Sequence, residues 1–323
     1  GKSRLTDELR GLLATDEAPG WAVGRCSPFE EDLPYHLLTS LVRSLAGVDA
    51  NASADVLAKA VADLAERCGT ADRTQVLQRL VGVPGDYAEV VPEALVESYG
   101  TALVELVRGL SEQTGPVVLV CEDVHWADPS SVTVASRIVN TVPGLQVLLL
   151  LVMRPDRDAG GWALLESARR ELGESLSEFP LRALDAAQSS ELLAHLLAIE
   201  SLPPTLRSAV AERAEGNPFY LEEVVRTLIE RGVVDRVDGR WIAREGTSDL
   251  AVPETIQGLL AARIDRLPPE VRRAGRVAAV IGRRFPVDLF SRVYGDEAGP
   301  GLHPHLATLE SHGLLRLEST DPE

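Results

Sequence analysis

A run of five apolar residues, Val117 to Cys121, is the feature that most constrains the fold of this chain. Gly115-Pro116 precedes the run, and Glu122-Asp123 follows it. A short apolar run with these boundaries is typical of a strand that is buried on both faces of a parallel sheet. Such sheets bind ligands at the edge where their strands end. The two acids are therefore predicted to lie at a ligand site.

The acidic pair suits the chemistry of a magnesium-bound nucleotide. One carboxylate holds the metal and its water shell, and a second acceptor orients the attacking water. Because side chains alternate along a strand, the two acids should have different roles, and we assign Glu122 to Mg²⁺ and Asp123 to the water. Taken alone, the pattern fits an ordinary buried strand with a solvated acidic turn equally well.

The first three residues, Gly1-Lys2-Ser3, match the end of the phosphate-binding loop G-x-x-x-x-G-K-[ST]. In that loop backbone amides hold phosphates, the lysine reaches the β and γ phosphates, and the hydroxyl binds Mg²⁺. Lys2 is one of only two lysines, and it precedes the candidate metal strand, as such folds require. The only methionine is Met153, so we expect the first strand and most of the loop to precede Gly1.

Composition narrows the class of protein. A chain of 323 residues can form two or three domains, and none of its apolar runs approaches the ~20 residues that span a membrane. Cys26, Cys68 and Cys121 show no spacing typical of disulfides or metal sites, which indicates a reducing cytoplasm. The net charge of −17 disfavours binding to nucleic acid.

Strands and helices alternate over residues 1–185, which predicts a parallel α/β sheet of the P-loop NTPase type. Apolar periodicity predicts helices at 4–14, 37–45, 56–68, 94–111 and 130–140, and strands at 21–26, 117–121, 147–152 and 179–184. The last of these is predicted to be an edge strand, because it contains Pro180.

Arg154 follows the predicted strand at 147–152. A guanidinium at this sheet edge can sense a γ-phosphate and stabilise the charge that develops as it leaves. A snorkelling surface arginine is the simpler explanation for the residue alone. Beside the two preceding motifs we favour the sensor role.

From residue 186 onward the pattern is mainly helical, and it predicts a helical lid (186–232) and a winged-helix-like domain (233–323). Gly216 ends one helix, Asn217 caps the next, and Pro218 suits its first turn, so capping alone explains these residues. The second domain is predicted from a hairpin that turns at Asp238-Gly239, helices at 254–267, 270–281 and 304–312, and a strand at 314–317.

With these motifs in place, the chain resembles an ATPase domain of the STAND class, within the AAA-related P-loop group. Domains of this kind occur beside class III nucleotide cyclase domains and in LuxR-type regulators. The resemblance rests on Gly1 to Leu5, Glu122 to Asp128, Arg154-Pro155, Glu215 to Phe219, Val252 to Ile256, Ala262 to Leu267 and, for the cyclase-associated branch, Ala278 to Phe285.

The resemblance implies an ATP/ADP site with Mg²⁺. The residues that would bind nucleotide are Gly1, Lys2, Ser3, Arg4 and Pro218, and Pro218 would touch adenine from the lid. Mg²⁺ would be bound by Ser3 and Glu122. Catalysis would involve Glu122, Asp123 and Arg154. It further implies a slowly hydrolysing regulatory switch in a larger signalling protein. Its partner would be a covalently linked effector domain, either a cyclase or a DNA-binding domain, and the protein could form homo-oligomers.

Two other hypotheses remain open. One is a scaffold for protein interactions that is locked by nucleotide and has no significant turnover. The other is DNA binding through the winged helix, for which Arg272, Arg273 and Arg276 are the best recognition residues. Glu270 and the acidic composition count against DNA binding.

Overall fold

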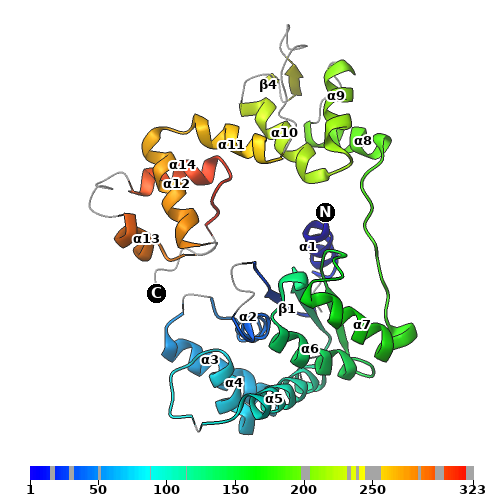
Figure 1. Ribbon diagram of the computed structural model, residues 1–323, viewed down its shortest axis with the longest axis vertical. Helices are drawn as coiled ribbons and strands as arrows, with labels where there is room; N and C mark the ends of the chain where they lie inside the picture. Colours follow the sequence, from blue (N-terminus) through cyan, green and yellow to red (C-terminus); the bar gives the residue numbers. More distant parts are fainter. Residues whose placement is uncertain are drawn as a thin grey trace. The chain divides into compact units, whose positions relative to one another are not determined.

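The computed structural model describes residues 1–14, 19–28, 33–49, 52–87, 89–113, 115–197, 204–230, 234–237, 240–243, 256–282, 285–294 and 302–317 (Figure 1). They form two compact units, residues 2–179 and 180–322, and each is described below by itself. The predicted division of the second unit into a lid and a winged helix stays a prediction.

A parallel three-stranded sheet lies at the centre of the first unit. Its strands are β1 (Gly20–Arg25), β2 (Val117–Glu122) and β3 (Val147–Leu151), in the order β1-β2-β3. Cys121 is in register with Gly24 on one side and with Leu151 on the other. The carboxyl ends of all three strands therefore share one edge, and the predicted parallel α/β sheet is confirmed.

One face of this sheet packs against α2 (His36–Leu45), α6 (Pro129–Thr141) and α7 (Gly160–Leu172). A small apolar space between them is bounded by Leu38 of α2, Ile138 of α6, Leu164 of α7 and the strand residues Cys121 and Leu149. Alternation places every second strand residue on this face, which explains why the strands are apolar here.

A second group of helices extends this core. It consists of α3 (Ala54–Arg67), α4 (Thr74–Leu80) and α5 (Pro92–Gln113), which Figure 1 shows beyond α2 and α6 from β1. Leu57, Leu64, Leu77, Leu103 and Leu106 are almost completely buried within it. The remaining helix of this unit, α1 (Lys2–Leu12), has no buried residue, and its Arg10 lies over the ring of Trp21 on β1.

The second unit begins with three helices that share a core. They are α8 (Ala186–Leu197), α9 (Pro204–Ala214) and α10 (Pro218–Glu230). Between α9 and α10, Gly216 has a positive φ of 73°, and the Asn217 side chain accepts a hydrogen bond from the Phe219 amide (3.0 Å). The predicted helix stop, cap and start at Gly216-Asn217-Pro218 are confirmed.

A hairpin and four further helices follow in this unit. Strands β4 (Val234–Val237) and β5 (Arg240–Ala243) are antiparallel, whereas the predicted turn at Asp238-Gly239 lies outside the described residues. The helices are α11 (Ile256–Arg266), α12 (Pro269–Ile281), α13 (Val287–Tyr294) and α14 (Leu302–Ser311). Val271 and Ala274 of α12, Phe290 and Tyr294 of α13 and Leu309 of α14 lie in one core. The winged-helix part of the prediction is not confirmed.

Two predicted strands are wrong. Residues 179–184 are irregular, with Phe179 83% exposed, and the Leu184 amide donates to the Gly216 carbonyl (2.9 Å) rather than to a strand. Residues 314–317 also form no strand. The Leu314 amide instead donates to the Leu309 carbonyl (2.9 Å) and closes the end of α14.

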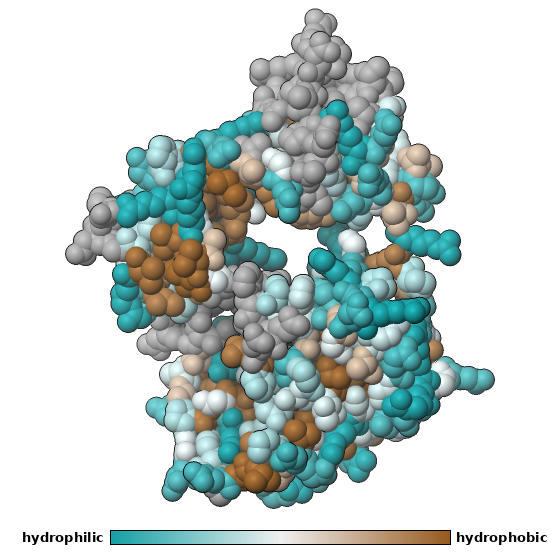
Figure 2. Space-filling model, viewed as in Figure 1, coloured by the Kyte–Doolittle hydropathy of each residue, from teal (hydrophilic) through white to brown (hydrophobic). Residues whose placement is uncertain are grey.

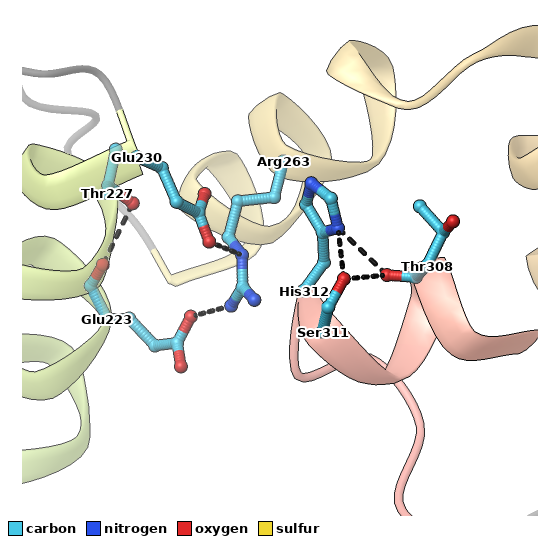
Figure 3. Close-up of polar contacts among 7 residues, drawn as sticks. All are labelled: Glu223, Thr227, Glu230, Arg263, Thr308, Ser311 and His312. Atoms are coloured by element: carbon cyan, nitrogen blue, oxygen red, sulfur yellow. Dashed lines mark hydrogen bonds and ion pairs between the residues drawn. The ribbon is translucent and has the colours of Figure 1, made fainter.

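Helices α10 and α11 are joined by charged side chains (Figure 3). Arg263 of α11 forms an ion pair with Glu223 of α10, and its Nε lies 3.5 Å from Glu230 Oε1.

Elsewhere on this unit, Figure 2 shows apolar side chains gathered over α13, where Val287, Leu289 and Val293 are 41%, 36% and 54% exposed. Among the described residues, no helix combines the length and apolar character that crossing a membrane requires.

Candidate functional site

The carboxyl edge of the sheet carries an ion pair between two neighbouring strands. Arg25 and Glu122 are in register at the ends of β1 and β2, and Arg25 Nε donates to Glu122 Oε2 at 2.9 Å. The Glu122 side chain is 13% exposed and that of Arg25 is 41% exposed. The predicted metal acid is therefore held by a cation of the protein. Arg25 lies within the strand predicted at 21–26 and was not among the predicted site residues, because its partner Glu122 is 97 residues away in the chain.

Asp123 turns the chain out of β2. Its backbone is left-handed (φ 53°, ψ 37°), a conformation that aspartate tolerates better than most residues, and a short 3-10 turn, η2 (Val124–Trp126), follows it. The Val124 amide donates to the Val152 carbonyl (3.0 Å), so this turn is tied to the end of β3, two residues before Arg154.

His125 lies in this turn and is only 5% exposed. Neither of its ring nitrogens has a hydrogen-bond partner within the described part of the chain. Burial is the main cause that lowers the pKa of His125. The positive charges of Arg154 and Lys2 lower this pKa further, whereas the negative charges of Asp123 and Asp156 raise it. Three of these charged residues, Lys2, Asp123 and Arg154, are predicted site residues.

Asp128 has a structural role in the same segment. Its Oδ1 accepts hydrogen bonds from the Ser131 amide (2.8 Å), which caps α6, and from the Tyr35 amide (3.0 Å), just before α2. Asp128 is only 3% exposed. Asp128 therefore holds the loop that follows η2 against the first turn of α6 and the residue before α2.

The remaining predicted residues lie at helix starts. Lys2 and Ser3 begin α1, Gly1 precedes it, and Arg4 forms an exposed ion pair with Glu8 one turn later (2.6 Å). Pro218 is the first residue of α10 in the second unit. Within the first unit, the charges of Lys2, Asp123 and Arg154 all contribute to the pKa shift of His125, and Glu122 is next to Asp123 in the sequence.

These side chains fit a magnesium nucleotide. The described residues contain no group of three or more His, Cys, Asp or Glu side chains suited to a metal. Mg²⁺ does not require one, because it is usually held by one or two carboxylates together with waters and phosphate oxygens. Glu122 and Asp123 supply the carboxylates, Ser3 a hydroxyl, and Lys2 and Arg154 the cations that phosphate attracts.

Comparison with known proteins also suggests that this chain binds nucleotide. Residues 1–152 match the family described as AAA ATPase domain, and residues 185–241 match a family described as a domain of unknown function. A protein of Rhizobium meliloti (strain 1021), described as uncharacterized, is 27% identical over 321 residues. The alignment covers 98% of this chain and 29% of that protein, so the chain spans less than a third of its relative's length. No solved structure matches. The first match supports an AAA-type P-loop ATPase and suggests nucleotide binding.

Proposed function

We propose that this chain binds ATP or ADP with Mg²⁺, hydrolyses ATP slowly, and serves as a regulatory switch within a longer protein. The observation that carries the proposal is the position of Glu122 and Asp123 at the carboxyl end of the central strand β2, where the Val124 amide ties the following turn to Val152, two residues before Arg154. A carboxylate after β2, a guanidinium after β3 and the amino group of Lys2 at the start of α1 are the charges that a triphosphate and its attacking water require. The match of residues 1–152 to the AAA ATPase domain supports the same assignment.

Each side chain has a distinct part in the proposed site. Lys2 binds the β and γ phosphates, and Ser3 and Glu122 bind the metal. Asp123 orients the attacking water, and Arg154 stabilises charge on the γ-phosphate as it leaves. When bound, Mg²⁺ supplies a positive charge that bridges the phosphates.

Neighbouring residues complete the proposed nucleotide contacts. Gly1 and Arg4 flank the phosphate-binding pair, and Pro218 contacts adenine from the helices of the second unit. These assignments rest on the resemblance to STAND-class ATPases.

The proposed output is a change of arrangement that follows the state of the nucleotide. Contacts that exist only with the γ-phosphate stabilise one arrangement of sheet and helices over another. A covalently linked effector domain, a cyclase or a DNA-binding domain, would respond to that change in a cytoplasmic signalling protein. Homo-oligomers offer a second way to transmit it.

A nucleotide-locked scaffold is the second candidate, and one observation favours it. The ion pair with Arg25 occupies one oxygen of Glu122, the acid assigned to Mg²⁺. A site whose metal ligand is held in this way can bind nucleotide and still turn over very little.

Nucleotide binding and Mg²⁺-dependent hydrolysis by the full-length protein test these two candidates. The switch requires that Lys2→Ala abolish tight binding and that Asp123→Asn abolish turnover while binding persists. Lys59→Ala is the matched control, because Lys59 is the only other lysine and is exposed on α3. Nucleotide binding without measurable turnover in the unaltered protein supports the scaffold, and no binding at all overturns both.

A further inference from the structure

The turn that carries Asp123 is hydrogen-bonded along its whole length. The Val124 amide donates to the Val152 carbonyl just after β3 (3.0 Å). Within η2, the Trp126 amide donates to the Asp123 carbonyl and the Ala127 amide to the Val124 carbonyl, each at 2.9 Å. Asp123 itself has a left-handed backbone (φ 53°), and a side chain other than glycine keeps this conformation only where its surroundings determine it. The direction of the Asp123 side chain is therefore set by this turn.

Asp128 anchors the far end of the same turn. Its Oδ1 accepts the Ser131 amide of α6 (2.8 Å) and the Tyr35 amide before α2 (3.0 Å), and its backbone carbonyl accepts the Val132 amide (3.0 Å). The residue is 3% exposed, so water cannot readily replace these bonds. Because one oxygen accepts both side-chain bonds, loss of the carboxyl group would release the turn from α6 and from the segment before α2 together.

The start of α7 contacts this turn backbone to backbone. A Cβ added at Gly160 would lie 2.6 Å from the Ala127 carbonyl oxygen, and one added at Gly161 would overlap the Val124 carbonyl. Only glycine allows two backbones to approach this closely. The turn therefore has little room to shift while α7 stays in place.

We propose that Asp128 is a positioning residue for the ATP hydrolysis proposed above, and that it holds Asp123 in the direction needed to orient the attacking water. This inference rests on the proposed function. Asp128 acts through the backbone of η2 and not on the nucleotide, because its Oδ1 already accepts two amides and the residue is buried. A misplacement of about 1 Å of a group that positions a reactant can cost about 100-fold in rate.

Four variants separate positioning from general stability. Asp128→Ala removes both side-chain hydrogen bonds, whereas Asp128→Asn keeps an oxygen acceptor and is an equally good helix cap. Gly161→Ala displaces the same turn from the side of α7 and leaves Asp128 intact. Gly109→Ala is the matched control, because its added Cβ also overlaps a backbone carbonyl in the first unit, that of Cys68 at the end of α3, and not this turn.

The measurement is steady-state Mg²⁺-dependent ATP hydrolysis by the full-length protein and its variants, with calorimetric ATP binding, at a temperature below every thermal midpoint. We expect Asp128→Ala and Gly161→Ala to lower kcat at least about tenfold and to change the Kd for ATP less than about threefold, because the turn moves while the binding residues stay. Asp128→Asn should stay within about threefold of the unaltered protein in both quantities. Gly109→Ala should lower the thermal midpoint and leave kcat unchanged.

Four outcomes overturn the proposal. An unchanged kcat in Asp128→Ala means that other contacts hold the turn, and the proposed function then stands without this role. An equal fall of kcat in Gly109→Ala means that stability of the unit, and not the turn, limits the rate. A loss in Asp128→Asn as large as in Asp128→Ala means that the charge of Asp128 acts, and not its hydrogen bonds. If the unaltered protein hydrolyses no ATP, both this inference and the proposed switch fail.

Discussion

Glu223 on α10 and Arg263 on α11 form an ion pair that is almost completely withdrawn from water. The Arg263 side chain is 1% exposed and the Glu223 side chain 7% exposed, and Glu230 is the second acid near the guanidinium (Figure 3). Glu223 belongs to the helix whose Leu221 and Val224 lie in one core, and Arg263 precedes Leu267 of another. The pair therefore links two separate apolar cores within the second unit.

Removing one partner of this pair should be strongly destabilising. We expect Arg263→Met to lower the free energy of unfolding by about 3–5 kcal/mol, because Glu223 is left as a buried charge without compensation. The double variant Arg263→Met, Glu223→Leu should recover most of that loss, since both charges are gone. Urea denaturation followed by circular dichroism measures both, and Arg292→Met, which breaks an exposed pair with Asp288, is the control. An Arg263→Met protein as stable as the unaltered one contradicts this expectation.

The pair between Arg25 and Glu122 should restrain turnover. If Arg25 competes with Mg²⁺ for Glu122, Arg25→Gln raises the rate of Mg²⁺-dependent hydrolysis. It also lowers the Mg²⁺ concentration at which hydrolysis reaches half its maximal rate. The gain should be only about threefold, because a half-exposed ion pair is worth about 0.5–1 kcal/mol. Steady-state hydrolysis across a Mg²⁺ series measures it. Arg73→Gln is the control, because Arg73 pairs with Glu105 on α5 instead. A large fall in rate for Arg25→Gln would show that Arg25 assists the reaction.

The parallel sheet could be predicted because two of its three strands, β2 and β3, are apolar runs that come shortly after glycine and proline. Val117 to Cys121 is buried, Val147 to Leu151 is half-buried except for the exposed Leu148, and the two runs pair directly. The segment at 179–184 (Phe-Pro-Leu-Arg-Ala-Leu) also carries apolar residues, but it pairs with no strand in the described part of the chain. Strand formation there depends on distant partners, which a local pattern does not reveal.

The candidate site was only partly predictable for a related reason. Sequence motifs identified Lys2, Glu122, Asp123 and Arg154, whose residue types reveal their chemistry. The pairing of Arg25 with Glu122 depends on the register of β1 against β2, 97 residues apart in the chain. The isolation of the His125 nitrogens depends on packing in three dimensions. Neither relationship has a signature in the local sequence.

Gly109 of α5 provides a test of helix packing. An added Cβ there would overlap the Cys68 carbonyl oxygen at the end of α3, whereas a Cβ at Gly11 of α1 would meet nothing. Helix propensity alone predicts that either Gly→Ala substitution stabilises by up to about 1 kcal/mol. We expect this gain for Gly11→Ala and a loss of about 1–3 kcal/mol for Gly109→Ala, because the two helices must move apart. Thermal unfolding compares the two variants. Equal stabilisation in both would show that α3 can move away from α5 without a loss of stability.

Cys121, in the centre of β2, should make stability depend on alkaline pH. Burial raises the pKa of its thiol to about 12, whereas an unfolded cysteine ionises near ~8.5. The folded pKa is the higher one, so its contribution is complete below pH ~8.5 and is lost as the pH rises toward 12, by about 1.4 kcal/mol per pH unit. Cys121→Val keeps an apolar side chain and removes this titration. Between pH 8.5 and 10, urea unfolding under reducing conditions should show the unaltered protein losing about 2 kcal/mol more than Cys121→Val. Equal losses would mean that the folded protein lets the Cys121 thiol ionise.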